Sequence, residues 1–254
     1  MAITIKSERE IELMAEAGKI LERVHNELEK ALRPGMSTKD IDTLGEEIIR
    51  SYGCIPSFLN YNGYPASICV SVNQEVVHGI PDKHRIIQEG DIVSLDAGVI
   101  YKGYHSDAAR THAVGEVSEE AKKLIQVTKE SFFEGIKFAK AGNHLFDISG
   151  AIGRYAEERG YGVVRDLCGH GIGTALHEAP EIPNYEVGRK GVRLRPGMTL
   201  AIEPMINIGT HEVDWLDDDW RVVTRDGSLS AHYENTILIT EGEPRILSLT
   251  CENE

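Results

Sequence analysis

Two helical segments followed by a group of strands form a pattern that occurs twice along the 254 residues. In the first occurrence, Ser7 and Glu10 form a capping box before apolar residues at helical spacing that continue to Pro34. A second helix is expected from about residue 37 to Gly53, and β-branched runs at 68–72 and 91–96 predict strands. Helical periodicity returns at 121–136 and 148–155, and the C-terminal third is strand-like again. This order predicts an α+β fold.

The two occurrences align at one constant offset along the chain, with matches at the joints between helices. The matched pairs are Gly35 with Gly142, Asp40 with Asp147, and Gly53 with Gly160. A chance match is the alternative, because glycine ends helices in many proteins. If the repeat is real, two pseudo-symmetric halves enclose a site between them. Since no Pro/Ser-rich linker separates them, we expect one domain over residues 1–254, with halves of roughly 1–115 and 116–254.

Composition narrows the class of protein. The 41 acidic and 27 basic residues give a net charge of −14, which disfavours nonspecific nucleic-acid binding and anionic membranes. There is no apolar run of membrane-spanning length, and the first ten residues contain Glu8 and Glu10 rather than a secretory signal, so we expect a cytoplasmic protein. The four cysteines form no C-x-x-C pair, and we expect reduced thiols at Cys54, Cys69, Cys168 and Cys251.

Two aspartates lie where a hairpin would bring them together. Asp96 and Asp107 are eleven residues apart, and the midpoint between them falls beside Gly103. We therefore predict that the two carboxylates face each other across a strand pair, where they would repel unless a proton or a cation lies between them. Two solvated aspartates on an exposed hairpin are the alternative for this pair taken alone.

Three further polar residues lie in segments that otherwise look buried. His170 stands between glycines in residues 168–173 (CGHGIG), Glu203 ends the apolar run 200–204 (LAIEP), and Glu234 lies within the β-forming run 231–239 (AHYENTILI). Charges in buried strands are costly unless they are paired or bind metal. Two divalent ions would neutralise the four carboxylates, and oxygen ligands with one imidazole suit manganese, iron, cobalt or zinc. The set therefore indicates a dinuclear hydrolytic centre.

At these residues the sequence resembles the type I methionine aminopeptidases, members of the pita-bread (creatinase/aminopeptidase) fold metallopeptidases. The resemblance runs nearly end to end. It is carried by residues 11–18 (IELMAEAG), 77–81 (VHGIP), 91–96 (DIVSLD), 168–173, 201–205 (AIEPM) and 233–236 (YENT). It implies a mostly antiparallel curved sheet and removal of the initiator methionine, preferentially before a small second residue.

The resemblance also implies roles for individual residues. Asp107 and Glu234 would bridge two ions, Asp96 would complete one ion's ligands, and His170 with Glu203 would complete the other's. Glu203 would also shuttle protons. His78 and His177, each in a His-x-x-Pro sequence, would hold the scissile amide and the tetrahedral intermediate. The methionine side chain would lie against Tyr61, Tyr64, Cys69 and Trp220. Leu176 and Phe58 depart from residues common in related enzymes, which leaves details of this pocket open.

Nascent polypeptide N-termini are the implied substrates, and we expect a monomer. Ribosome docking, where a nascent-chain enzyme would work, would have to use local basic surface. The chain itself begins Met1-Ala2, so its own initiator methionine is a candidate substrate. Two other functions stay open. One is a prolyl-specific relative such as aminopeptidase P or prolidase, and the other is a non-catalytic pita-bread binding protein.

Overall fold

The computed structural model describes residues 2–249; Met1 and Cys251, for which the sequence suggested removal and a reduced thiol, lie outside the described residues. The first helix, α1 (Glu8–Ala31), begins with the expected capping box of Ser7 and Glu10. The second, α2 (Thr38–Ser51), begins with a second capping box, in which Ser37 and Asp40 exchange hydrogen bonds. Both helices bury their apolar faces against the sheet, where Leu21 and Val24 of α1 join strand residues in one core cluster.

The central sheet comprises nine strands within the described part of the chain, in the path β1-β4-β5-β14-β9-β7-β8, with β2 paired to β4 and β15 paired to β14. All of its pairings are antiparallel. The strands are β1 (Ile55–Pro56), β2 (Ile68–Val72), β4 (Ile92–Tyr101), β5 (Tyr104–Ala113), β7 (Gly169–Gly171), β8 (Glu178–Ile182), β9 (Thr199–Ile202), β14 (Glu234–Leu238) and β15 (Arg245–Ile246).

Two smaller sheets extend this framework. One has the order β13-β10-β6 and the other β11-β12-β3. Their strands are β3 (Glu75–Val77), β6 (Gly162–Val163), β10 (Met205–Asn207), β11 (Val213–Trp215), β12 (Val222–Thr224) and β13 (Ser230–His232). A short 3-10 turn, η1 (Tyr61–Gly63), lies between β1 and β2 in the chain.

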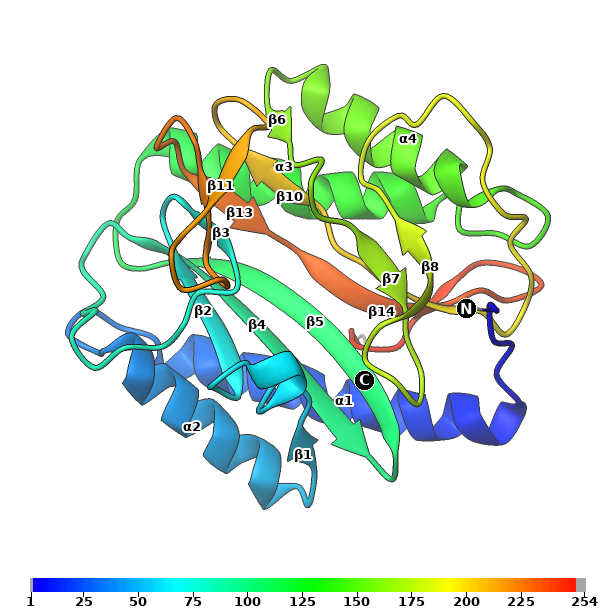
Figure 1. The fold of residues 1–254 in the computed structure, drawn as a ribbon, viewed down its shortest axis with the longest axis horizontal. Helices are drawn as coiled ribbons and strands as arrows, with labels where there is room; N and C mark the ends of the chain where they lie inside the picture. Colours follow the sequence, from blue (N-terminus) through cyan, green and yellow to red (C-terminus); the bar gives the residue numbers. More distant parts are fainter. Residues whose placement is uncertain (1, 250–254) are drawn as a thin grey trace.

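The helices cover the same side of both halves of the sheet. In Figure 1, α1 and α2 lie along β2, β4 and β5, while α3 (Glu119–Ile136) lies beside β10 and β13, and α4 (Leu145–Glu157) packs on α3 and contacts β6 and β8. In the second half, Phe132 and Ile148 pack with sheet residues such as Leu200 in another core cluster. η1 and the β7–β8 loop lie on the viewer's side, away from α1. The helix-free face is therefore left for a site.

The same backbone contacts recur in the two halves, at the offset that takes Gly35 to Gly142. The isolated bridge between Ser37 and Ile86 is repeated by His144 and Arg193. The N–H groups of Gly35 and Gly142 donate to the carbonyls of Ile87 and Leu194, which are separated by the same offset. Gly35 and Gly142 have φ values of 90° and 95°, a left-handed conformation that glycine adopts without steric cost. The sequence matches thus coincide with matching local geometry.

None of the helices in residues 2–249 combines the length and apolarity needed to traverse a bilayer. Cys54 and Cys69 are buried and Cys168 is half-buried, and all three are free thiols, as the absence of paired cysteine motifs predicted.

Candidate metal centre

Five adjacent strands each bring one polar side chain to the helix-free face of the sheet. Asp96 lies on β4, Asp107 on β5, Glu234 at the start of β14, Glu203 directly after β9, and His170 on β7, and these strands are neighbours in that order. The register aligns them, because β14 pairs Glu234 with Ala109 and Asn235 with Ile202, while β7 pairs His170 with Ala201. Side chains from both halves of the chain therefore meet in one place.

The register of the β4–β5 hairpin differs from the sequence prediction. Asp96 pairs with Ala109, and Asp107 pairs with Gly98, so the expectation that the two aspartates lie directly opposite each other was wrong. The reason is the turn: Lys102 and Gly103 both have positive φ, and this two-residue turn pairs Tyr101 with Tyr104. The shifted register makes the aspartates diagonal neighbours on one face of the ladder, which keeps both carboxylates in the site.

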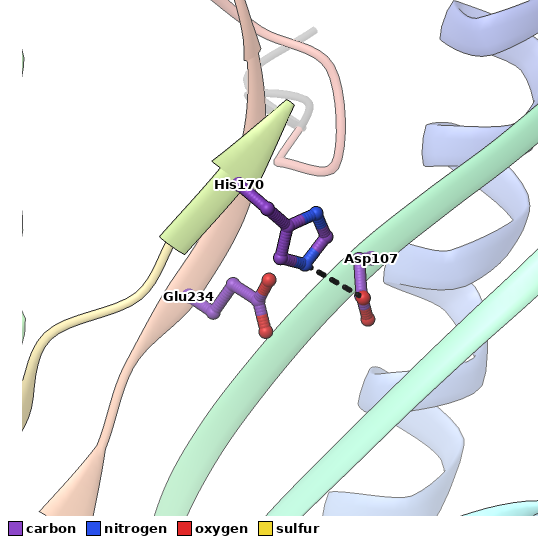
Figure 2. A group of neighbouring side chains, drawn as sticks. All are labelled: Asp107, His170 and Glu234. Atoms are coloured by element: carbon purple, nitrogen blue, oxygen red, sulfur yellow. Dashed lines mark ion pairs between the residues drawn. The ribbon is translucent and has the colours of Figure 1, made fainter. Parts of the chain in front are cut away.

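The closest grouping consists of Asp107, His170 and Glu234, each of which places one ligand-type atom within 4.8 Å of the others (Figure 2). The Nε2 atom of His170 lies 3.8 Å from Oδ2 of Asp107 and 3.6 Å from Oε1 of Glu203. Its other ring nitrogen, Nδ1, lies 2.9 Å from the carbonyl oxygen of Gly171 and donates to it in the neutral tautomer. That tautomer leaves the Nε2 lone pair directed at the carboxylates, as in a metal-binding histidine.

The glycines around His170 are required by close packing rather than by an unusual φ. A Cβ atom at Gly169 would overlap the carbonyl oxygen of Ala201 on β9, and one at Gly171 would overlap the carbonyl oxygen of Ala179 on β8. The sequence CGHGIG is thus what allows β7 to fit between its two neighbours and to present the imidazole.

The carboxylates of the site have raised pKa values, so their ionised forms are unfavourable unless a proton or a cation neutralises them. Burial raises the pKa of Asp107 to about 7, and burial together with the neighbouring carboxylates raises the pKa values of Asp96, Glu203 and Glu234 well above their ordinary range. Burial also lowers the pKa of His170 to about 3, so its ring is neutral. One oxygen each of Asp96, Asp107 and Glu234 has no hydrogen-bond partner among residues 2–249.

These features fit a metal centre. Buried carboxylate oxygens without partners are rare because leaving them unsatisfied is costly. Two divalent ions would neutralise the four carboxylates and occupy the unpartnered oxygens. The donor set of oxygens with a single imidazole, without thiolate, suits manganese, iron, cobalt or zinc.

A cavity of about 340 Å³ opens onto the five side chains. All eleven residues that the sequence singled out line it, so the structure brings the whole candidate set together. They are Asp96, Asp107, His170, Glu203, Glu234, His78, His177, Tyr61, Tyr64, Cys69 and Trp220. Phe58, Asn62 and Leu176 complete the lining. Asn62 gave no sequence signal.

The two histidines of the His-x-x-Pro sequences approach the cavity from opposite halves. The His177 ring lies 4.1 Å from that of His170, and its Nδ1 atom is 2.7 Å from the hydroxyl of Tyr61. His78 has a positive φ of 59°, a strained conformation typical of functional loops, and its ring meets Trp220 edge-on at 6.2 Å. Burial lowers the pKa of His78 to about 4.

The remaining walls are apolar and fixed. Tyr64 packs edge-on against Trp220 with ring centroids 5.1 Å apart, and its hydroxyl donates to the carbonyl oxygen of Gly79 at 2.9 Å. Cys69 is 4 % exposed, and burial raises the pKa of its thiol well above the ordinary value. A protonated, buried thiol behaves as a small apolar group rather than as a nucleophile.

Sequence reasoning missed His232, which lies behind the carboxylates with its Nε2 atom 3.9 Å from one oxygen of Glu203 and 3.9 Å from one oxygen of Glu234. Its position two residues before Glu234 was the available signal, since residues at i and i+2 of an extended segment share a face.

The chain is similar to known proteins along nearly its whole length. Residues 12–241 match the model of metallopeptidase family M24. The chain is 58% identical to the methionine aminopeptidase of Clostridium acetobutylicum, over 98% of this chain and 100% of the relative. A crystal structure of methionine aminopeptidase from Thermotoga maritima superposes with a TM-score of 0.96 at 47% identity, covering 98% and 100% of the two chains. An Xaa-Pro dipeptidase from Bacillus anthracis is more distant, with a TM-score of 0.77 at 28% identity, and this chain spans 62% of it.

Proposed function

This chain belongs to metallopeptidase family M24, and we propose that it is a metal-dependent aminopeptidase that removes N-terminal methionine from peptides and nascent proteins, preferentially before a small second residue. The observation that carries the proposal is the meeting of two buried carboxylates, Asp107 and Glu234, two half-buried ones, Asp96 and Glu203, and one imidazole in a cavity with apolar walls. The extent of identity to methionine aminopeptidases supports methionine as the residue released.

We assign the binding of two divalent ions to Asp96, Asp107, His170, Glu203 and Glu234. Asp107 and Glu234, on the neighbouring strands β5 and β14, would contribute to both ions, Asp96 would contribute to one, and His170 with Glu203 would contribute to the other. When bound, such ions polarise the scissile carbonyl and lower the pKa of water, so that a nucleophile is available near neutral pH.

Glu203 is the candidate proton shuttle. It follows the last residue of β9 and precedes Pro204, so it lies at the edge of the ladder with its side chain 15 % exposed, whereas Asp107 and Glu234 are almost completely enclosed. A carboxylate that reaches both water and the reacting atoms can take a proton from the attacking water and return it to the leaving amine.

His177 and His78 are the candidates for positioning the substrate. If the Tyr61 hydroxyl donates to Nδ1 of His177, the opposite nitrogen, Nε2, carries the proton and can donate to the oxygen on which charge develops. His78, which meets Trp220 edge-on and lines the same cavity, would hold the backbone of the residue that follows the scissile bond. A neutral imidazole at this position can donate or accept a hydrogen bond.

The methionine side chain is assigned to the wall formed by Tyr61, Tyr64, Cys69 and Trp220. Aromatic rings and a protonated thiol provide an apolar surface, and thioether sulfur makes favourable contacts with aromatic rings. The hydrogen bond from Tyr64 to Gly79 fixes one ring, so the wall is formed before substrate arrives.

We further propose that residues 1–254 form one catalytic domain of two halves, roughly 1–115 and 116–254, which is supported by the backbone contacts that repeat between the halves. We propose that the enzyme acts as a monomer, since the five candidate metal ligands come from adjacent strands of a single chain. A cytoplasmic location, with nascent N-termini as substrates and the ribosome as a docking partner, completes the proposal.

Release of free methionine from Met-Ala-Ser tests this function. Metal-free protein should release none, and protein reloaded with manganese or cobalt should release it. Met-Leu-Ser should react more slowly, because its second residue is large, and Ala-Pro-Ser should not react.

Two outcomes would contradict the proposal. Cleavage of Ala-Pro-Ser in preference to Met-Ala-Ser would establish the prolyl-specific alternative. If protein with confirmed bound metal released no methionine and cleaved neither peptide, the non-catalytic binding protein would take its place.

A further inference from the structure

His232 is a buried histidine whose surroundings include both the metal centre and a second cavity. Its side chain is 2 % exposed, and Nε2 has no hydrogen-bond partner within residues 2–249. The neighbours of that nitrogen are one oxygen of Glu203 and one oxygen of Glu234, each 3.9 Å away. Carboxylate oxygens only accept hydrogen bonds when ionised, so an N–H at this position has two candidate acceptors and no competitor.

The backbone of His232 is fixed from two sides. On one side it pairs with Met205 of β10. On the other, Thr111 of β5 makes a reciprocal contact, in which its hydroxyl donates to the carbonyl oxygen of His232 and accepts from the N–H of the same residue, both at 2.9 Å. Ser94 lies 2.7 Å from the same hydroxyl. The segment that carries the ring is therefore rigid. A side chain that holds other groups in place requires such a fixed backbone.

Space filling alone does not account for the ring. Besides facing the carboxylates, His232 lines a cavity of about 310 Å³ on the other side, together with His25 and His112. Glu203 and Glu234 line the catalytic cavity, and His232 does not. The imidazole thus separates the metal centre from this second cavity, which we call the rear cavity. If the position only had to be filled, an apolar side chain would do so without leaving a buried nitrogen unpaired.

We propose that His232 is a positioning residue: its Nε2–H group directs its proton at the carboxylates of Glu203 and Glu234 from 3.9 Å, beyond direct hydrogen-bond distance, and orients them electrostatically for the metal ions. This inference rests on the proposed metal centre and adds a partner behind its ligands. Metal-bound carboxylates are commonly oriented by such donors, and loss of one typically lowers metal affinity about 10- to 100-fold.

Calorimetric titration of manganese into metal-free protein tests the proposal without reference to activity. His232→Leu, which has no donor, should bind about 10- to 100-fold more weakly than wild type. His232→Gln keeps an N–H donor and should restore most of the affinity. His25→Leu is the matched control, because His25 is also buried and lines the rear cavity, but its Nε2 atom contacts the carbonyl oxygen of Ala108 instead; its affinity for manganese should stay near wild type.

Wild-type affinity in His232→Leu would overturn the inference, and so would an equal loss in His232→Leu and His232→Gln, which would indicate packing rather than donation. If His232→Leu fails to fold, nitrogen NMR of the zinc-loaded wild type decides: the inference requires a proton on Nε2 of His232, and an unprotonated Nε2 contradicts it. Absence of metal binding in the wild type would instead remove the metal centre itself and with it the proposed function.

Discussion

Replacement of Asp107 by asparagine in the metal-free protein should increase its stability near neutral pH. Burial raises the pKa of Asp107 from the 3.8 of a free aspartate to about 7. Since the folded-state pKa is above the unfolded value, the folded protein holds more protons between about pH 4 and 7. The free energy of unfolding therefore decreases as the pH rises through this window, and is least affected below pH 4.

The magnitude follows from the shift of about three pKa units, at about 1.4 kcal/mol each. Asp107 alone should destabilise the metal-free protein by about 4 kcal/mol near pH 7.5 and by about 2 kcal/mol near pH 5. Asparagine stays neutral, so Asp107→Asn should recover up to these amounts. Asp96, Glu203 and Glu234 shift in the same direction, so the substituted protein should still lose stability as the pH rises.

Urea unfolding in the presence of a chelator, near pH 5 and near pH 7.5, measures both quantities. Asp42→Asn is the matched control. Asp42 is equally buried, but its oxygens accept from the N–H groups of Ser67 and Ile68 and from Lys39. Its replacement should destabilise the protein by about 1–3 kcal/mol. If Asp107→Asn gave no gain near pH 7.5, or if metal-free wild type became more stable from pH 5 to 7.5, the view of the site as a set of uncompensated acids would be refuted.

Three further substitutions test the role of Glu203, the contact between Tyr61 and His177, and the packing at Gly18. Glu203→Gln should lower turnover at least about 100-fold and weaken metal binding; near-native activity with full metal content would exclude the shuttle role. Tyr61→Phe removes a hydrogen bond of about 1 kcal/mol to His177 and should lower kcat/KM for methionine release about fivefold. An unchanged kcat/KM would show that this hydrogen bond does not position His177 for catalysis. Gly18→Ala, which would improve helix propensity, should instead destabilise by about 1–3 kcal/mol in urea, because its Cβ would overlap the carbonyl of Leu247; greater stability would contradict that contact.

The helices and the gathering of the site could be predicted because their signals are local. Capping residues such as Ser7 mark helix starts directly, and charged residues such as Glu203 and Glu234 within apolar strands reveal a buried polar site whatever the topology. The spacing of Asp96 and Asp107 likewise predicted a hairpin with both carboxylates on it.

Other features depend on geometry that a linear pattern does not contain. The exact register of the hairpin follows from positive φ at both Lys102 and Gly103, and lysine at such a position is unusual. The contact between Tyr61 and His177 joins residues 116 positions apart. His232 becomes recognisable only when Glu203, from another strand, is known to lie beside Glu234.

Anomalous diffraction from crystals of the manganese-loaded protein, recorded near the manganese absorption edge, shows directly whether these side chains form a dinuclear centre. Two anomalous peaks are expected about 3.5–4 Å apart in the 340 Å³ cavity, between Asp96 on one side and His170 on the other, with Asp107 and Glu234 contacting both. Manganese-loaded protein that is active in solution but shows no peak among these side chains, or ions bound only elsewhere, would contradict this expectation.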